Sequence, residues 1–431
     1  MDSGLLAALG PGMTGERMPH TDILVLGAGI VGTSVALHLA QRGLKVTLVD
    51  RQGPGEGTSY GNAGIIEGDT VFPPAFPSDF GTLARIALKR STIANYHLTF
   101  LPRVVPWLLA FRAASQPERL VETARLMRPL FARAVAEHAA LVAASGAEGH
   151  LRKTGWLKLY RSDASFAALK REFDLAASFG IALNPLDVDG ALALEPSLAP
   201  VFRHAVYWPG AASVDNPLAL TQAYAAHFAA LGGVTVSGDA RTLRRAGPNW
   251  LVDTAGGSVE AEQAVVALGP WAPDVLDPLG IKLPLGIKRG YHLHFSAHGN
   301  AGLTRPVLDA DFGYCLAPMQ QGIRLTTGAE FAARDAQPSP VQIGRVMPYA
   351  KALFPLSAPI EPKPWLGCRP CFADSRPVIG KAPGQPGLWL AIGHAHWGLT
   401  LGPATGRLIA EMITDATPFC DPAPYRAERF G

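Results

Sequence analysis

The stretch TDILVLGAGIVGTSVALHLAQRGLKVTLVD, residues 21–50, decides the fold. It opens with an unbroken apolar run over residues 23–26, which is typical of a strand buried on both faces. Gly27, Gly29 and Gly32 follow in the pattern G-x-G-x-x-G. In this pattern the first glycine allows a tight turn, the second lets the backbone approach a pyrophosphate, and the third lets a helix pack against the strand.

The remainder of this stretch predicts a helix and a second strand. The helix is expected over residues 30–42, with Gly43 as a left-handed cap, and the second strand over residues 46–49. Asp50 stands at the tip of that strand, where a carboxylate can accept hydrogen bonds from a ribose diol. Because these parts come in order, the stretch predicts a dinucleotide site whose phosphates face the helix N-terminus. The alternative is that the glycines serve helix packing alone.

Length and composition indicate a large globular protein. The chain has 431 residues, of which 48% are apolar and 17% charged, enough for two domains and a sizeable core. A formal net charge of +3 without a Lys/Arg-rich run argues against nucleic acid as a partner. Four cysteines do not make a disulfide framework, so a reducing, cytoplasmic compartment is the simplest interpretation. We expect no membrane-spanning segment, because no run of about 20 apolar residues occurs.

Two segments bear on location. Residues 1–19 are expected to form a loose extension, since they lack the basic start and apolar core of a signal peptide. Residues 102–111, PRVVPWLLAF, are apolar with one Trp. Such a stripe either packs inside the protein or touches a membrane surface, so peripheral contact with the inner face of the cell membrane stays open. The sequence does not indicate an oligomeric state.

The segment after Asp50 departs from a simple nicotinamide-binding domain, in which a helix would follow. Residues 53–68 read GPGEGTSYGNAGIIEG, rich in glycine and small polar residues. The side chains of Thr58, Ser59 and Asn62 can bond phosphate or flavin edges, and the loop leaves directly from the strand that bears Asp50. We therefore favour a cofactor-binding loop over an ordinary surface loop.

The rest of the chain alternates between helical and strand patterns. The expected strands are 156–160, 234–236, 263–269, 287–295, 315–318, 323–327 and 388–392, and the expected helices are 166–178, 215–231, 338–353 and 403–413, with a mostly helical region over 69–147. Residues 393–400 are expected to form a turn. The final strand, turn and helix follow one another in the same order as in the first motif. A cofactor contacted by both ends of the chain suggests FAD rather than NAD.

Several stretches together resemble a known family. They are residues 27–50, the segment TSYGNAG at 58–64, GCRP at 367–370, DSRPVIG at 374–380 and Gly-His at 393–394. The sequence resembles the FAD-dependent amine oxidoreductases that include D-amino acid oxidase, glycine oxidase and sarcosine oxidase. Within them it looks most like the bacterial D-amino acid dehydrogenase branch. The resemblance covers nearly the whole chain.

This resemblance implies an α/β (α+β) protein of two domains. One is a Rossmann-like FAD-binding domain assembled from residues 20–70, 215–285 and 365–420, and the other is a substrate-binding domain from residues 71–214 and 286–364, with helices and an antiparallel sheet over the flavin. The cofactor-binding candidates are Gly27, Ala28, Gly29, Ile30, Val31, Gly32, Asp50, Arg51, Thr58, Ser59, Asn62, Ala63, Gly64, Ile65, Gly269, Gly393, His394, Gly398, Leu399 and Thr400.

The same resemblance implies the catalytic candidates. Arg369 occupies the position of a carboxylate-binding arginine, whose planar fork suits a bidentate carboxylate; the alternative is a structural ion pair, for instance with Asp374. His394 and His396 can bond the flavin edge or favour the neutral substrate amine, unless they are packing histidines. Tyr291 either projects over the flavin or is a packed cross-strand aromatic.

One feature departs from the family pattern, and another allows a different interpretation. Trp397, within GHAHWG, replaces a more glycine-rich version and is expected to reshape the site. Cys368 and Cys371 spell C-x-x-C, but without a second cysteine pair a metal site is not expected. Cys368 is offset by one residue from the flavin-tethering cysteine of sarcosine oxidases, so we expect non-covalent FAD and two small buried residues.

The implied activity is FAD-dependent oxidation of a D-amino acid, or a related secondary amino acid, to an imine and then a keto acid. The electron acceptor would be a quinone or a redox partner. Alternatives are an oxygen-using oxidase of glycine, sarcosine or an opine, and a flavin-binding subunit of a larger complex. A nicotinamide dehydrogenase is the weakest alternative. The sequence does not indicate which amino acid is the substrate.

Overall fold

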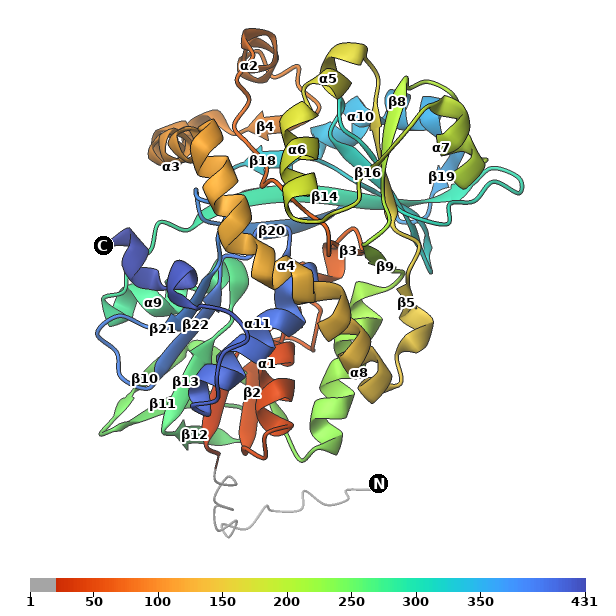
Figure 1. Ribbon diagram of the computed structural model, residues 1–431. Helices are drawn as coiled ribbons and strands as arrows, with labels where there is room; N and C mark the ends of the chain where they lie inside the picture. Colours follow the sequence, from red (N-terminus) through yellow and green to blue (C-terminus); the bar gives the residue numbers. More distant parts are fainter. Residues whose placement is uncertain (1–20) are drawn as a thin grey trace, which may run out of the picture.

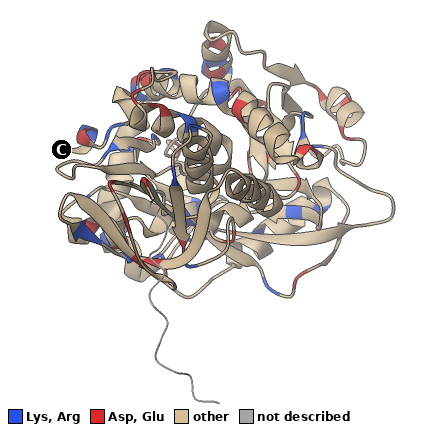
Figure 2. Cartoon of the chain, turned by 90° about the horizontal axis from the view of Figure 1, so that it is seen from below, with Lys and Arg blue, Asp and Glu red and all other residues tan. Residues whose placement is uncertain are grey.

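The computed structural model describes residues 21–431, so the expected extension over residues 1–19 lies outside the described residues. Two large β-sheets occupy the two halves of the molecule, and α4 (Pro117–Ser145) runs diagonally across both halves (Figure 1). Seen from below, basic and acidic positions are interspersed over this face (Figure 2). This mixed distribution agrees with the small net charge of the sequence.

The first sheet contains the Gly-rich stretch. Its strand order is β12 (Gly257–Ala261), β11 (Asn249–Thr254), β10 (Val234–Ala246), β2 (Val46–Asp50), β1 (Ile23–Leu26), β13 (Gln263–Val266), β22 (Leu388–Ile392) and β21 (Val378–Lys381). The five strands from β10 to β22 are parallel neighbours, with Leu24 in register with Thr47 and Ala264. Parallel strands end at one edge of a sheet, so chain segments far apart in sequence meet there.

Helices cover this sheet on one face. They are α1 (Ile30–Ala40), α4, α8 (Pro217–Ala230) and α11 (Gly398–Ile413). All four contribute to one core with Ile23 and Val25 of β1. The opposite face packs with α9 (Pro273–Leu276), β11 and β12. Because both faces are covered, β1 is fully buried, as its apolar run predicts.

The second sheet is larger and mostly antiparallel. Its strand order is β4 (Ala94–Tyr96), β18 (Ala329–Phe331), β14 (Gly286–Ala297), β17 (Gly322–Thr326), β16 (Tyr314–Met319), β15 (Val307–Asp309), β6 (Trp156–Tyr160), β8 (His204–Trp208) and β7 (Asn184–Leu186), with β19 (Leu356–Pro359) and β20 (Trp365–Cys371) also paired to β14. A small third sheet joins β3 (Ile65–Ile66), β9 (Ala212–Val214) and β5 (Leu151–Arg152).

Shorter helices surround this second sheet. They are α2 (Phe80–Ala87), α3 (Leu101–Ala114), α5 (Asp163–Ala167), α6 (Lys170–Ser178), α7 (Val188–Leu194) and α10 (Val341–Leu353). Alternation along β14 separates its two faces. Tyr291, Leu293 and Phe295 pack in the core that includes α10, whereas Lys288 and Gly290 line a cavity.

The last helix differs from its prediction. It begins at Gly398, inside the expected turn, rather than at Pro403. Pro403 has no N–H for the carbonyl of Leu399, one turn earlier. That carbonyl instead accepts a hydrogen bond of 2.7 Å from Nε2 of His138 on α4. Proline is therefore tolerated inside this helix because α4 supplies a hydrogen bond to the free carbonyl. The helix propensities of the neighbouring residues do not predict such a contact.

Two further observations concern the expected elements and domains. The helix expected over 166–178 is split into α5 and α6. β20 lies within the segment 365–420 but pairs with β14 of the second sheet, and α4 packs with the helices of the first. The predicted domain boundaries stay a prediction. The α/β fold class with a Rossmann-like unit and an antiparallel sheet is confirmed.

The close approach of α1 to the first turn yields a prediction. A Cβ on Gly32 would lie 1.8 Å from the Gly27 carbonyl oxygen, which the backbone cannot accommodate without moving. We expect Gly32→Ala to lower the free energy of unfolding by about 1–3 kcal/mol, the usual cost of overpacking, and to weaken FAD binding. Gly344→Ala in α10, where a Cβ meets nothing within 4 Å, should instead stabilise by about 0.5–1 kcal/mol. Denaturant titration compares the two, and equal effects would contradict the packing role.

Candidate active site

One cavity of about 730 Å³ extends between the two sheets and collects most of the predicted site residues. It runs from Asp50 at the edge of the first sheet to Arg369 and His396 below the second. Its lining includes every cofactor-binding candidate except Ala28, Gly32, Gly64 and Thr400. These four lie behind the lining, where Gly32 packs α1 and Thr400 bonds the Ile65 carbonyl. Whether the lining residues bind a cofactor stays a prediction.

The glycine turn forms one end of the cavity. Gly27 has φ +104°, and a Cβ there would lie 2.6 Å from the Ala267 carbonyl oxygen, so glycine is required. α1 starts at Ile30 without a capping side chain of its own, and the Ile30 N–H donates to Oγ of Ser59 at 2.9 Å. The start of α1, with its positive dipole end, therefore faces the cavity as a site for phosphate.

Asp50 is held rigidly beside this turn. Its Oδ2 accepts from the Ala28 N–H at 2.7 Å and its Oδ1 from the Gln52 N–H at 3.0 Å. Each carboxylate oxygen keeps a further lone pair for a ribose hydroxyl. The Arg51 guanidinium lies 4.8 Å from the centre of the Trp271 ring, closing this end of the cavity.

The loop after Asp50 is tied to the second sheet. Thr58 Oγ1 donates to the Cys368 carbonyl at 3.1 Å, and Asn62 Nδ2 to the His396 carbonyl at 3.1 Å. Arg324 on β17, buried beneath the loop, donates to the carbonyls of Tyr60 and Asn62 at 2.8 and 2.6 Å. The polar side chains of the loop therefore fix its shape as well as line the cavity.

Arg369 is the most distinctive charged group of the cavity. Its guanidinium lies against Gly290 and donates to the carbonyls of Thr327 and Gly328, both at 3.2 Å. No carboxylate among residues 21–431 forms an ion pair with it, and burial lowers its pKa. The alternative of a structural pair with Asp374 is wrong, because that carboxylate pairs with Arg376 and Arg429.

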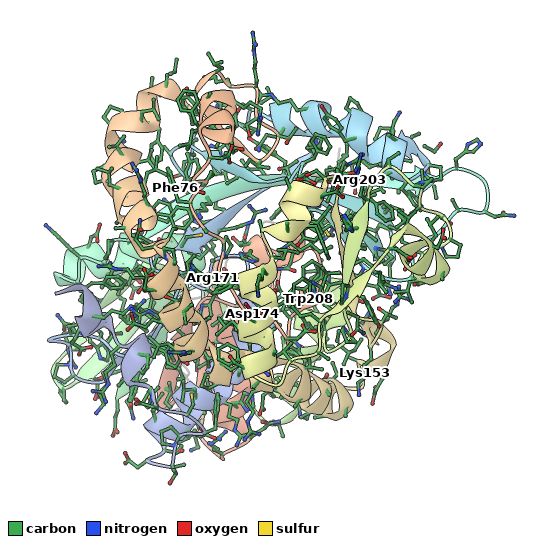
Figure 3. The ribbon with its side chains drawn as sticks, turned by 45° about the horizontal axis from the view of Figure 1, so that its top comes forward. Phe76, Lys153, Arg171, Asp174, Arg203 and Trp208 are labelled. Atoms are coloured by element: carbon green, nitrogen blue, oxygen red, sulfur yellow. The ribbon has the colours of Figure 1, made fainter. Side chains whose placement is uncertain are left out.

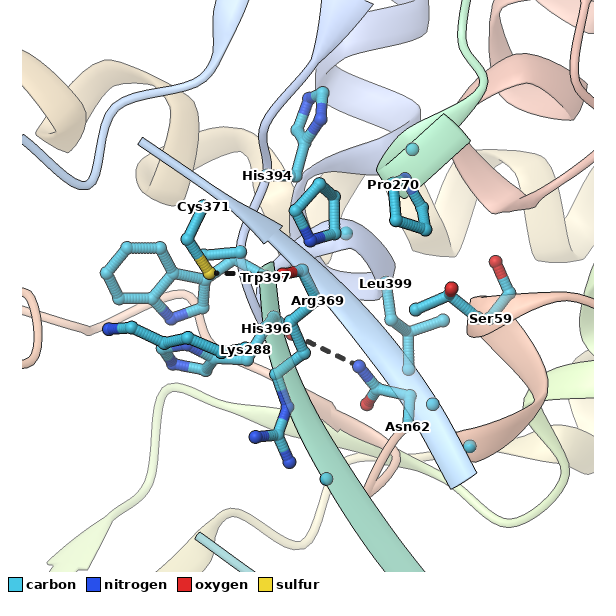
Figure 4. A pocket seen from close by; sticks show the side chains of 18 of the residues that line it. Ser59, Asn62, Pro270, Lys288, Arg369, Cys371, His394, His396, Trp397 and Leu399 are labelled. Carbon is cyan, nitrogen blue, oxygen red and sulfur yellow. Dashed lines mark hydrogen bonds between the residues drawn. The ribbon is translucent and has the colours of Figure 1, made fainter. Parts of the chain in front are cut away.

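Other cavity residues gather around Arg369 (Figure 4). Lys288 is directly opposite Arg369 on the neighbouring strand, and its ammonium lies over the rings of Trp107 and Phe111 on α3. Enclosure by the surrounding protein, together with the positive charges of Arg369 and Lys288, lowers the pKa of His396 to about 3, although the residue is exposed to the open cavity. His396 is therefore a neutral imidazole at neutral pH beside two basic groups, and burial also lowers the pKa of Lys288.

His394 occupies a different environment. It is buried, its Nε2 lies 2.9 Å from Oγ1 of Thr405 on α11, and burial lowers its pKa to about 3. Its backbone forms a bridge to Cys371. His394 therefore joins α11 to β20 at the cavity wall, and its ring is already hydrogen-bonded within the protein.

Tyr291 borders the cavity, but its side chain packs in the core that includes α10. It is 2% exposed and, by the alternation of β14, belongs to the face that packs with α10. Its hydroxyl donates to Glu330 at 2.8 Å and accepts from the Ser339 N–H at 2.7 Å. Glu330 also pairs with the fully buried Arg289 at 2.9 Å. These contacts favour the packed aromatic, and the catalytic role of Tyr291 stays a prediction.

The C-x-x-C pair is divided between the two faces of β20. Residues three apart on a strand point to opposite sides, so Cys371 lines the cavity while Cys368 lies near the Arg334 carbonyl. All four cysteines are free thiols, and no group of metal-ligating side chains occurs among residues 21–431. Trp397 is 2% exposed and packs edge-on against Phe131 of α4, so it shapes the wall from behind.

Sequence reasoning missed several charged residues of the cavity. Lys288 lines the cavity and Arg324 lies beneath its loop; both belong to strands whose alternation was recognised, but neither belongs to a motif. Glu67 and Lys158 line the cavity from β3's loop and from β6. Only the pairing of distant strands brings them to one face of the sheet, which local sequence does not specify.

The residues present fit FAD. The phosphate end offers a glycine turn, a helix N-terminus and the Asp50 carboxylate, and the cavity continues from there past Gly393 to Arg369. The substrate end combines a cation with neutral His396. Among residues 21–431, no helix is long and apolar enough to cross a membrane.

Comparisons with known proteins agree with this geometry. The family model described as FAD dependent oxidoreductase matches residues 22–412. The chain is 32% identical to D-amino acid dehydrogenase 2 of Ralstonia nicotianae, over 94% of this chain and 100% of that protein. It is 28% identical to a D-amino-acid oxidase of Bradyrhizobium diazoefficiens, over 95% of this chain and 98% of that protein.

A solved structure shows the same fold. Glycine oxidase from Geobacillus kaustophilus is 24% identical, with a TM-score of 0.72 over 95% of this chain and 98% of that one. The resemblance found in the sequence is thereby confirmed. The chain belongs to the family of FAD-dependent oxidoreductases.

Proposed function

We propose that the protein oxidises a D-amino acid, or a related secondary amino acid, at FAD to the imine, and passes the electrons to a quinone or another acceptor. Water then converts the imine to a keto acid and ammonia when the amine is primary. The observation that carries this proposal is the Arg369 guanidinium, which lines the cavity and has no carboxylate partner among residues 21–431. The names of the two curated relatives support it.

The guanidinium suits an α-carboxylate for electrostatic and geometric reasons. Two of its N–H groups are bonded to backbone carbonyls, which orients the plane and leaves the others for a ligand. A half-buried guanidinium without a counter-ion is unfavourable, and an anionic ligand removes part of that cost. A two-point grip then fixes the substrate α-carbon relative to the cofactor.

The surrounding charges act on the substrate amine. FAD, when bound, supplies the acceptor for the hydride that leaves the α-carbon. The positive charges of Arg369 and Lys288 disfavour an ammonium nearby, and so favour the neutral amine whose lone pair assists that departure. Neutral His396 can accept a hydrogen bond from the amine without adding charge.

Peripheral membrane contact is the second part of the proposal, and it suits a quinone acceptor. Five large apolar side chains are exposed on and around α2 and α3, namely Phe80 (85%), Leu88 (65%), Leu98 (63%), Leu109 (61%) and Val105 (43%). We call them the α2–α3 patch; both helices lie at the edge of the molecule (Figure 1). The acidic residue of the segment 78–116 is Asp79, whereas its basic residues are Arg85, Lys89, Arg90, Arg103 and Arg112. Apolar and basic groups together match an anionic lipid surface.

Replacing Arg369 separates substrate binding from folding. Arg369→Ala should raise KM and lower kcat, with a loss of about 10- to 150-fold in kcat/KM, because charge-assisted hydrogen bonds contribute roughly 1.5–3 kcal/mol. Arg369→Lys keeps the charge but not the fork and should remain impaired. Steady-state kinetics on D-amino acids measures both variants, while FAD content should stay near that of the parent protein.

Arg289 is the matched control for this prediction. It lies on the strand beside Arg369 but is paired with Glu330. Arg289→Met leaves that carboxylate buried and unpaired, so the expected result is a loss of about 3–5 kcal/mol in unfolding free energy. If Arg369→Ala behaved in the same way, with KM of the folded enzyme unchanged, Arg369 would be structural and the proposed function would lose its main support.

Flavin absorbance reports both the reaction and the acceptor. Anaerobic mixing with a panel of D- and L-amino acids, hydroxyproline isomers and sarcosine should bleach the flavin with at least one D-amino or secondary amino acid. A soluble quinone should then restore the oxidised spectrum much faster than oxygen does. Comparable rates would make the protein an oxidase, and bleaching by none of these compounds would refute amino-acid oxidation.

Vesicle binding tests the α2–α3 patch. The protein should co-sediment with vesicles of equal parts phosphatidylglycerol and phosphatidylethanolamine, and much less with pure phosphatidylcholine. Replacing Phe80, Leu98 and Leu109 by Ser should abolish this binding, since each buried side chain contributes roughly 1.5–3 kcal/mol. Serine at Val201, Leu231 and Val341, exposed apolar residues elsewhere, should not. Binding that survives the first triple substitution would exclude this surface.

A further inference from the structure

The cavity continues beyond Arg369 along one row of the second sheet. This row is made of residues paired between neighbouring strands, and all of them line the cavity. They are Thr326 of β17, Cys315 of β16, Leu308 of β15 and Lys158 of β6. Paired residues of neighbouring strands point to the same face. With strands about 4.8 Å apart, the row extends about 14 Å from Thr326 to Lys158. It begins next to the Thr327 carbonyl that holds Arg369.

The far end of this row is polar although it lies inside the cavity. Lys158 lines it without a carboxylate within 4 Å among residues 21–431. Burial opposes the charge of Lys158, but Glu172, Tyr160 and Glu67 together raise its pKa above the ordinary value. Lys158 is therefore a cation with free hydrogen-bonding capacity toward the cavity.

Glu67 lies beside it. Its backbone N–H donates to Oγ1 of Thr400 at the start of α11, and its carboxylate accepts from the Thr70 hydroxyl. Burial, with the charge of Asp69, raises the pKa of Glu67 to about 7. The carboxylates of Glu172 and Glu67 thus both oppose the positive charge of Lys158.

Two indoles complete this end. Trp156 is two residues before Lys158 on the same face of β6, and it stacks on Trp208 with ring centres 5.4 Å apart. Both rings line the cavity (Figure 3 labels Trp208). We call Glu67, Thr70, Trp156, Lys158, Glu172 and Trp208 the side-chain subsite.

We propose that the side-chain subsite binds the side chain of the substrate and selects neutral side chains that both donate and accept hydrogen bonds, such as hydroxyl and carboxamide groups. Lys158 only donates, whereas Glu67 accepts when it is ionised and also donates when it is protonated, so a hydroxyl or an amide satisfies both groups. An anionic side chain is repelled by the carboxylates of Glu67 and Glu172, and a cationic side chain is repelled by the ammonium of Lys158. An apolar side chain leaves buried charges unpaired, which polar sites reject strongly. This inference rests on the proposed function.

Matched substrate pairs test the subsite. The pairs are D-serine with D-2-aminobutyrate, D-threonine with D-valine, and D-asparagine with D-leucine. In the parent protein kcat/KM should favour the polar member of at least one pair. Lys158→Met should lower that preference about 10- to 100-fold, the usual worth of a hydrogen bond to a charged group, and Glu67→Gln should lower it too. Lys153→Met, an exposed lysine outside the cavity, is the control and should change nothing.

The outcomes distinguish the two proposals. Turnover of none of these amino acids, together with no bleaching by the hydroxyproline isomers and sarcosine of the wider panel, would refute the proposed function. Turnover without a polar preference, or an equal loss for both members of a pair in Lys158→Met and Glu67→Gln, would refute the subsite alone. FAD content and melting temperature identify a variant that fails to fold. If either Lys158→Met or Glu67→Gln fails to fold, the other variant shows whether the preference for the polar substrate is lost or retained.

Discussion

The common edge at which the parallel strands end is the constraint on which the rest of the structure depends. β1, β2, β13 and β22 run side by side in one direction, so the residues that follow them meet although they are as far as 366 positions apart, from Gly27 to Gly393. The phosphate turn, Asp50 and the turn before α11 are assembled by this rule alone. The Gly32 contact then sets how closely α1 can approach, and with it the direction of its N-terminus.

Sequence reasoning succeeded where chemistry is local and failed where it depends on pairing. The glycine turn and Asp50 lie close together in the sequence, so their spacing in the sequence predicts their arrangement in space. Arg369 came from a motif, not from spacing. Tyr291 shows the limit, because the face to which a strand residue points depends on which neighbours cover each side of the sheet. The start of α11 was misplaced since Pro403 is tolerated only through a contact with His138, remote in sequence.

Two arginines on neighbouring strands show how the same residue type serves structure and recognition. Arg289 is fully buried with Glu330 and its guanidinium is saturated by backbone carbonyls and Tyr291. Arg369 has two carbonyl bonds and no carboxylate. A saturated pair has nothing to offer a ligand, whereas the unpaired cation is stabilised only when an anion arrives. The difference in pairing, visible without any bound molecule, separates the structural arginine from the proposed binding one.

The charges along the cavity also decide which way a substrate lies. Arg369 and Lys288 supply positive charge at one end, while Glu67 and Glu172 surround Lys158 at the other. A substrate turned end for end would place its carboxylate beside two carboxylates and its side chain beside an unpaired guanidinium. Both placements are unfavourable, because like charges repel and the guanidinium would keep no counter-ion. In the proposed function, the charge distribution would therefore fix the orientation of the substrate at its α-carbon, and the shape of the cavity would select among side chains in that orientation.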